Sequence, residues 1–222
     1  MTKDFAIIPV KGVVESKSRL VRSLSPQDKK KLVIALLEDV LAAVTESQLF
    51  SRVLVVSPDP NVEKEANLPN GIFLHQEGQG LNAGIRRSTL FAMREKASSV
   101  AVLLADIPML EPRDLKELYS VGSTAPKVVV SPSLKGGTNV MVQEPPNLIA
   151  PAYGRWSFST HLRAAQKAGL AVYSISNSRL SFDVDTLEDL IAVARKDPHG
   201  KTRTAKCLQE MTLLHVLARG SK

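Results

Sequence analysis

Short runs of hydrophobic residues alternate along this chain with longer segments in which apolar positions recur at helical spacing. The runs that predict strands are Phe5–Val10, Arg52–Ser57, Ile72–His75, Val100–Ala105, Val128–Ser131, Thr138–Gln143 and Ala171–Ile175, with a short extended piece at Phe182–Val184. The segments that predict helices are 25–45, Leu81–Lys96, Pro112–Tyr119, Ser159–Ala168 and Thr186–Arg195. Because strands and helices alternate, the pattern indicates an α/β fold with a mostly parallel sheet.

Helix-start signals support two of these helices. Ser25 is a suitable cap, Pro26 suits the first helical position, and Asp28 complements the positive end of the helix. Thr186 and Asp189 have the spacing of a capping box. Both helices therefore have defined starting points in the sequence.

Two consecutive strands near residues 128–143 interrupt the alternation. A Lys-Gly-Gly turn at residues 135–137 joins them with no helix between, which predicts an antiparallel insertion in a mixed sheet. We therefore expect a three-layer α/β/α sandwich over residues 1–196. Asp197–Gly200 then breaks the chain, and apolar residues recur at helical spacing after Thr202, which predicts a basic helical extension over residues 197–222.

Composition and charge narrow the class of protein. With 222 residues, 44% of them hydrophobic and 23% charged, the chain matches ordinary globular proteins rather than disordered ones. No apolar run approaches the roughly 20 residues of a membrane helix, and the first residues predict a strand rather than a signal peptide. The single cysteine, Cys207, cannot form an internal disulfide, so we expect a cytoplasmic protein.

The net charge of +7 favours anionic partners such as nucleotides and phosphorylated metabolites, although it also serves solubility. Residues 197–222 carry +3 of this charge and contain no aromatic residue, which argues against a nucleic-acid-binding module.

Three cations follow the first predicted strand: Lys11, Lys17 and Arg19. Ligands of α/β proteins bind at the carboxyl ends of strands, so these side chains could neutralise a phosphate; a solvated basic loop explains them equally. The loop lacks the Walker pattern. Residues 78–84 are rich in glycine and precede a predicted helix, an arrangement that suits either close backbone approach to an anion or an ordinary flexible loop.

Three aspartates are candidate metal ligands. Asp106 follows an apolar strand and could bind a ligand, or simply form a turn. Asp183 and Asp185 are two residues apart, so in extended backbone they project to the same side. Paired carboxylates repel unless a cation offsets them, which favours Mg²⁺; capping of the next helix by Asp185 or Thr186 is the alternative.

The segment Tyr153–His161, with residues 137–141, supplies hydroxyls, backbone donors and the single tryptophan, Trp156. Ser157 and His161 are four residues apart, but no nucleophile elbow presents the serine, and a helix entry explains the segment equally. Cys207 and the histidines lack metal-ligand spacing and are interpreted as structural; the histidines are His75, His161, His199 and His215.

The order of these motifs resembles one family. PVKG, SKSRL, LNAG, ADIPML, GGTNVM, YGRWSFSTH and FDVDTLEDL occur in this order over roughly residues 5–195, as they do in the 2-phospho-L-lactate guanylyltransferases. That family makes the GTP-derived intermediate of coenzyme F-420 biosynthesis. The resemblance implies the nucleotidyltransferase version of the glycosyltransferase-A sandwich. Related enzymes of that fold usually have a glycine-rich loop after the first strand; here the segment PVKGVVESKSRL, residues 9–20, takes its place, as it does in the guanylyltransferase family.

The resemblance also implies roles for individual residues. It places Mg²⁺ on three aspartates: Asp106, Asp183 and Asp185. It makes Lys17, Arg19 and the metal ligand Asp106 the catalytic residues, because the two cations and the bound Mg²⁺ neutralise the charge of the phosphates. It places the nucleotide against residues of two loops: Val10, Lys11, Lys17, Gly80, Leu81, Asn82 and Gly84. It places the phosphorylated acid at Thr138, Gly154 and Ser157. One departure is Trp156, which stands where the family pattern leads us to expect a second glycine and could reshape the acid pocket.

The implied reaction needs little side-chain chemistry, because a phosphomonoester oxygen is already anionic and can attack the α-phosphorus of GTP directly. The alternatives are a different nucleotide, phosphoenolpyruvate or 3-phosphoglycerate in the same fold, or an RNA-binding module. We also expect a homodimer, because the apolar stripe of the C-terminal helix needs a surface to cover it.

Overall fold

The computed structural model describes residues 3–12, 24–66, 68, 71–76, 80–122 and 124–211. Within them the chain forms one seven-stranded sheet in the order β3-β2-β1-β4-β6-β5-β7. The strands are β1 (Asp4–Pro9), β2 (Arg52–Ser57), β3 (Gly71–His75), β4 (Ser99–Leu103), β5 (Lys127–Pro132), β6 (Thr138–Glu144) and β7 (Ala171–Ser174). Strand β6 runs antiparallel to both of its neighbours, and the other described pairings are parallel. The predicted mixed sheet is therefore confirmed.

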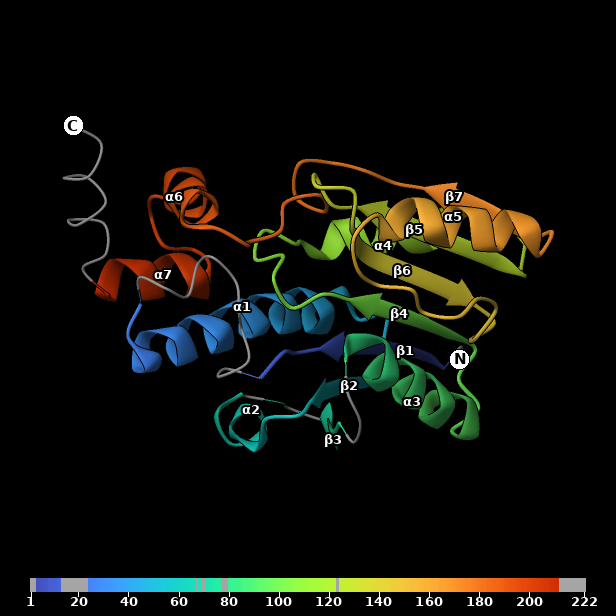
Figure 1. Cartoon of the computed structure of the whole chain (residues 1–222), viewed down its shortest axis with the longest axis horizontal. Helices are drawn as coiled ribbons and strands as arrows, with labels where there is room; N and C mark the ends of the chain where they lie inside the picture. The colour runs from blue at the N-terminus through green and yellow to red at the C-terminus, as the bar shows by residue number, and fades with distance from the viewer. Residues whose placement is uncertain are drawn as a thin grey trace.

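Helices cover both faces of the sheet, which gives the expected three layers (Figure 1). On one face pack α1 (Pro26–Ser47), α2 (Pro60–Glu65) and α4 (Pro112–Ser120), which share a buried core with every second residue of the central strands. On the other face pack α3 (Leu81–Arg94) and α5 (Ser157–Lys167), which cover the alternate residues. This two-sided burial explains why the strands are continuous apolar runs rather than alternating ones.

The local signals correctly predicted the starts of two helices, α1 and α6. The Ser25 hydroxyl accepts a hydrogen bond from the backbone N–H of Asp28, and Thr186 and Asp189 form the capping box at the start of α6 (Leu187–Lys196). Two predictions need correction. Helix α2 was not predicted, although Pro60 occupies its first position and the side chain of Asp59 caps it. Residues 182–184 form no strand, because their segment packs beside the end of β4 and does not join the sheet edge.

The C-terminal helix α7 (Arg203–Glu210) packs against the chain's own α1. Asp39 of α1 accepts hydrogen bonds from the backbone N–H groups of Arg203 and Thr204, at 2.7 and 2.9 Å, and from the Thr204 hydroxyl at 2.6 Å. Leu208 is buried with Leu32 in the same cluster. The described part of the predicted apolar stripe is therefore covered within the chain; the rest of the stripe, with Leu214, lies outside the described residues.

Among the described helices, none combines the length and the apolar character that a membrane crossing requires. The division of the chain into residues 1–196 and an extension stays a prediction.

Candidate active site

The site lies at the carboxyl ends of the parallel strands, where the loops after β1 and β4 meet. These strands are neighbours, so the residues that follow them emerge at the same edge of the sheet. Val10 stays attached to the sheet, since its N–H donates to the carbonyl oxygen of Val56 at 2.8 Å, and Lys11 beyond it is exposed. Lys17 and Arg19 lie outside the described residues.

The three predicted aspartates come together at this edge. The N–H of Val184 donates to the carbonyl oxygen of Asp106 at 2.9 Å, which fixes the segment of Asp183 and Asp185 beside the end of β4. Burial and then the charges of Asp183 and Asp185 raise the pKa of Asp106 to about 7, while Lys11 acts in the opposite direction. Burial and the charge of Asp185 raise the pKa of Asp183 to about 6. The three carboxylates therefore repel one another, as expected of groups that share a cation.

The donor chemistry of this cluster fits a hard divalent cation. Asp106 Oδ1 is buried and, within the described part of the chain, has no hydrogen-bond partner. Among the described residues, no group of three or more acidic, histidine or cysteine side chains is arranged so that it could hold a metal ion by itself. Mg²⁺ does not need such a group, because it is usually held by one or two carboxylates together with substrate phosphates and water. Asp106 and Asp183 can therefore supply the protein's share of such a site.

Lys135 is a cation at this site that the sequence analysis passed over. Its Nζ lies 3.1 Å from Asp185 Oδ2 and 3.0 Å from Asp189 Oδ2. The turn that carries it precedes β6, and because β6 is antiparallel, its first residues lie at the same sheet edge as the ends of β1 and β4. The Lys-Gly-Gly turn was visible in the sequence. Whether Lys135 lies at the site, however, depends on the direction in which β6 runs, and the turn alone does not give that direction.

A cavity of about 120 Å³ connects the predicted nucleotide residues with the aspartates. Lys11, Leu81, Asp106 and Asp185 line it, and α1 closes one side with apolar side chains that include Leu36. A neighbouring hollow shares Val10, Lys11 and Leu81 and extends to Gly80. Residues predicted to bind the nucleotide therefore border two adjoining spaces beside the acidic cluster.

The two glycines predicted to bind the nucleotide, at and near the start of α3, differ in their structural role. Gly80 caps α3 with a φ of +90°, a conformation that favours glycine, and a Cβ there would meet nothing within 4 Å. Gly84 is buried, and a Cβ there would lie 2.7 Å from the side-chain oxygen of Gln76. Gly80 therefore leaves open space at the helix start, whereas Gly84 permits close packing.

The predicted acid-binding residues also lie together. Thr138 begins β6 and Ser157 begins α5, and both are buried; a Cβ on Gly137 would lie 3.9 Å from the Ser157 hydroxyl. Gly154 has a φ of +145° and open space around it. Trp156 adopts a φ of +61°, a left-handed conformation that favours glycine, which explains why a glycine is expected at this position. Its ring lies close to Gly136, where a Cβ would be 2.8 Å from the ring.

Asn82 joins the nucleotide side of the site to the acid side. Its Nδ2 donates to the carbonyl oxygen of Tyr153 at 3.0 Å, and its Oδ1 accepts from the N–H of Tyr153 at 2.7 Å. The amide of Asn82 therefore holds the first turn of α3 against the residue that precedes Gly154. This contact joins positions 71 residues apart in the sequence.

Replacing Asn82 by leucine should weaken both halves of the site. The change removes both hydrogen bonds and leaves the backbone groups of Tyr153 without partners, which should lower the free energy of unfolding by about 1–3 kcal/mol. The KM for the nucleotide and the KM for the acid should both rise. Two-substrate kinetics would measure the KM values, and urea unfolding would measure the loss of stability. Asn82→Asp isolates the donor: it keeps the acceptor for the Tyr153 N–H but sets a second acceptor oxygen against the Tyr153 carbonyl oxygen, so it should also lose stability. A rise confined to the nucleotide KM would contradict the linking role.

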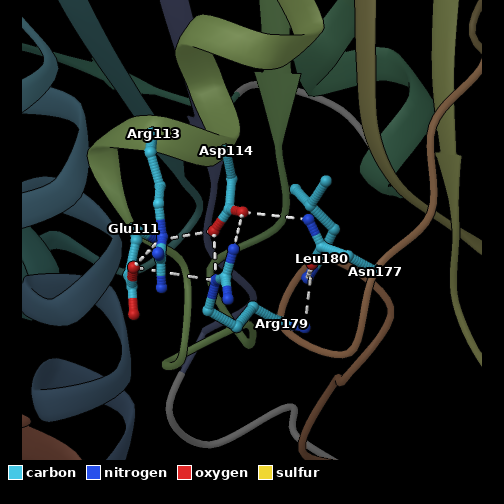
Figure 2. A network of polar contacts seen from close by, with 6 residues as sticks. All are labelled: Glu111, Arg113, Asp114, Asn177, Arg179 and Leu180. Carbon is cyan, nitrogen blue, oxygen red and sulfur yellow. Dashed lines mark hydrogen bonds and ion pairs between the residues drawn. The ribbon is translucent and has the colours of Figure 1, made fainter.

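A buried polar network holds the segment that leads to Asp183 (Figure 2). The carboxylate of Asp114, in the first turn of α4, accepts hydrogen bonds from Arg179 Nε at 2.8 Å and Arg179 Nη2 at 2.5 Å. It also accepts from Asn177 Nδ2 at 2.9 Å and from the N–H of Glu111 at 3.0 Å. Asn177 Oδ1 in turn accepts from the N–H of Leu180 at 2.9 Å. Three of the four hydrogen bonds that Asp114 accepts thus fix residues 177–180, a few positions before the acidic pair, and the fourth caps α4 at Glu111.

The strand order and the helices on both faces of the sheet define the fold class, which is that of the nucleotide-diphospho-sugar transferases. The structure superposes with a TM-score of 0.74 on a Desulfovibrio desulfuricans protein whose proposed class is nucleotide-diphospho-sugar transferase, at 18% identity and with 95% of each chain covered. Residues 4–220 match the family described as "Guanylyl transferase CofC like", and this chain belongs to that family.

Two relatives with assigned reactions are similar over most of the chain. The phosphoenolpyruvate guanylyltransferase of Rubrobacter xylanophilus is 39% identical over 84% of this chain and 91% of its own length. The 2-phospho-L-lactate guanylyltransferase of Methanothermobacter thermautotrophicus is 33% identical over 99% of this chain and 96% of its own. The family predicted from the order of motifs is therefore confirmed.

Proposed function

We propose that this enzyme transfers GMP from GTP to the phosphate of a three-carbon phosphorylated acid, phosphoenolpyruvate first, and releases pyrophosphate. The observation that carries the proposal is the buried, unpartnered oxygen of Asp106 beside Asp183 and Asp185, at a sheet edge that also presents Lys11. The names of the relatives supply the substrates, and phosphoenolpyruvate is the acid of the relative with the higher identity of the two.

The residues of the chain provide position and charge rather than a general base. A phosphate oxygen of the acid attacks the α-phosphorus of GTP, the bond from that phosphorus to the bridging oxygen breaks, and pyrophosphate leaves with the electron pair. Asp106 and Asp183, with Asp185, would hold Mg²⁺, which when bound supplies charge neutralisation for the phosphates. Lys11 adds positive charge from the β1 side, and Lys17 and Arg19 are proposed to add more.

Thr138, Gly154 and Ser157 are proposed to bind the acid. Two buried hydroxyls and the open backbone at Gly154 offer hydrogen-bond donors to anionic oxygens. The guanine nucleotide is proposed to lie against Val10, Gly80 and Leu81, with Asn82 and Gly84 shaping that wall.

A second acid, 2-phospho-L-lactate, is favoured by the relative that matches the chain over 99% of its length. Either product is a GMP-linked three-carbon acid, so both acids are consistent with a role in coenzyme F-420 biosynthesis, in the cytoplasm.

The test is a matrix of four nucleoside triphosphates against phosphoenolpyruvate, 2-phospho-L-lactate and 3-phosphoglycerate with Mg²⁺, following pyrophosphate release. GTP with phosphoenolpyruvate should give the highest kcat/KM. A higher value with 2-phospho-L-lactate would change the acid but keep the reaction. Release that is independent of any acid, or no release at all, would contradict the proposal.

A homodimer is also proposed, on the general prevalence of two-fold assemblies. Because the described residues of α7 are covered by α1 and α6, the proposal no longer rests on that face. Light scattering of the full chain at micromolar concentration should give twice the mass of 24.1 kDa; a monomer would overturn it.

Trp156 should report binding of the acid. Trp156 is 57% exposed, its ring packs over Gly136, and it precedes Ser157, so an anion at Ser157 should change its environment. Addition of phosphoenolpyruvate with GTP and Mg²⁺ should alter the emission of this single tryptophan, whereas lactate should not. An unchanged spectrum during proven turnover would separate this segment from the pocket.

A further inference from the structure

His161 is a buried residue of α5 that the proposed reaction does not yet use. It lies four residues after Ser157, so both side chains project from the same face of the helix, and both are almost fully buried. Its ring makes two polar contacts. Nε2 accepts a hydrogen bond from the backbone N–H of Ala152 at 2.9 Å, and Nδ1 lies 3.0 Å from the hydroxyl oxygen of Thr138.

The contact with Ala152 determines which ring nitrogen carries the proton. A backbone N–H can only donate, so Nε2 must be the unprotonated, accepting nitrogen. A neutral imidazole has one N–H, which therefore lies on Nδ1. Burial lowers the pKa of His161 to about 4, so the ring is neutral at neutral pH. Nδ1–H thus donates to the oxygen of Thr138.

The hydroxyl of Thr138 then has a fixed direction. Its oxygen already accepts from His161, and so its own proton is free to be donated elsewhere. Among the described residues, the Thr138 hydroxyl has no hydrogen-bond partner other than His161. Thr138 begins β6 at the sheet edge of the site, directly after Gly137, where a Cβ would lie 3.9 Å from the Ser157 hydroxyl. The free proton therefore belongs to a donor in the acid half of the site.

We propose that His161 is a positioning residue: it fixes the Thr138 hydroxyl as a hydrogen-bond donor to an anionic oxygen of the acid substrate. This inference rests on the proposed function, because it deepens the role of Thr138 in binding the acid. The chain of bonds runs from the Ala152 N–H to the imidazole, from the imidazole to the Thr138 oxygen, and from the Thr138 proton to the acid. Each group keeps one role, so the site is arranged before the substrate arrives.

The competing explanation is that His161 only fills the core beside Tyr153, with which its ring makes an edge-to-face contact at 5.0 Å. The two explanations differ in whether the effect of His161 passes through Thr138. A double-mutant cycle and the tautomer of the ring distinguish them.

The first measurement is the ¹⁵N spectrum of the imidazole rings in the substrate-free protein at neutral pH, with His161 assigned by its loss in His161→Phe. We expect the Nδ1–H tautomer. An Nε2–H tautomer or an imidazolium at His161 would overturn the proposal, and this readout does not depend on which acid is the substrate.

The second measurement is kinetic. Thr138→Val should raise the KM for the acid about tenfold to a hundredfold, the range expected for a hydrogen bond to an anion, and leave the KM for GTP unchanged. His161→Phe should raise the KM for the acid about tenfold in the wild-type background and less than twofold in the Thr138→Val background. Equal effects of His161→Phe in both backgrounds would show a packing role only and would overturn the proposal.

Two variants serve as matched controls. Thr138→Ser keeps the hydroxyl and should stay within about threefold of the wild-type KM for the acid. Thr89→Val removes a buried hydroxyl that donates to Ile85 within α3, and it should leave both KM values unchanged. A wild-type enzyme with no acid-dependent pyrophosphate release would contradict the proposed function, whereas an active enzyme with additive variants would contradict this inference alone.

Discussion

Asp106→Asn should lower turnover by about a thousandfold and leave the protein folded. The loss follows because the variant removes a negative charge from the place where a cation and the phosphates of GTP are proposed to meet, and one such electrostatic contact is commonly worth 10²–10³ in rate. Stability should not fall, because the Asp106 carboxylate has a buried oxygen without a partner and two carboxylates beside it. Pyrophosphate release and thermal unfolding would measure the two effects.

A second readout makes this prediction independent of turnover. Ligands that bind only the folded protein raise its melting temperature, so Mg²⁺ with GTP should stabilise the wild type and should stabilise Asp106→Asn much less. Asp183→Asn should behave in the same way. Glu63→Gln, on the exposed surface of α2, is the control and should match the wild type. A folded Asp106→Asn enzyme with near-normal turnover would mean that the acidic cluster is not the metal site.

Asp114→Ala should lower the free energy of unfolding by about 3 kcal/mol, the scale on which a buried ion pair is broken. Asp114 is fully buried, and its removal breaks the four hydrogen bonds that it accepts (Figure 2). The side chain of Arg179, which is 26% exposed, then has lost the carboxylate that it binds. Arg113→Met is the matched control. Arg113 pairs with Glu111 near the surface and is 68% exposed, so its loss should cost less than about 1 kcal/mol. Urea unfolding would compare the two; equal losses would contradict the role of Asp114.

The contribution of Asp114 should also depend on pH. Burial alone would raise the pKa of Asp114, but hydrogen bonds from Arg179, Glu111 and Asn177 outweigh it and hold this pKa below its ordinary value. A carboxyl whose pKa is lower in the folded state stabilises the protein above its unfolded pKa of about 3.9, and this stabilisation is lost as the pH falls through the folded pKa. The stability gap between wild type and Asp114→Ala should therefore be constant near neutral pH and narrow below about pH 4.

The comparison of sequence and structure separates local information from long-range information. The apolar runs predicted all seven strands of the described residues. The signal is strongest for the central strands β1 and β4, which are covered on both faces and so are hydrophobic at nearly every position. Ser25 and Thr186 predicted helix starts, because a cap acts on amides only two or three residues away. Asp106, Asp183 and Asp185 were predicted from their places after a strand and in a spaced pair, and the structure brings them together.

Other features were decided by the tertiary structure. Lys135 and Thr138 meet the site only because β6 runs antiparallel, which brings its first residues to the edge where the parallel strands end. His161 reaches Thr138 from α5, a separate element. The partner of Asp114 is 65 residues away in Arg179, and the partner of Asn82 is 71 residues away in Tyr153.

The sequence by itself thus determined the elements, the layers and the family, because periodicity, caps and motifs depend on residues that are near one another in the chain. Asp106 and the Asp183–Asp185 pair come from separate segments and meet only in the tertiary structure. Only the tertiary structure decided which polar groups pair across the site and which nitrogen of His161 carries the proton. The physical reason is that a hydrogen bond depends on the position of both partners, and for these residues the second partner comes from a distant strand, helix or loop.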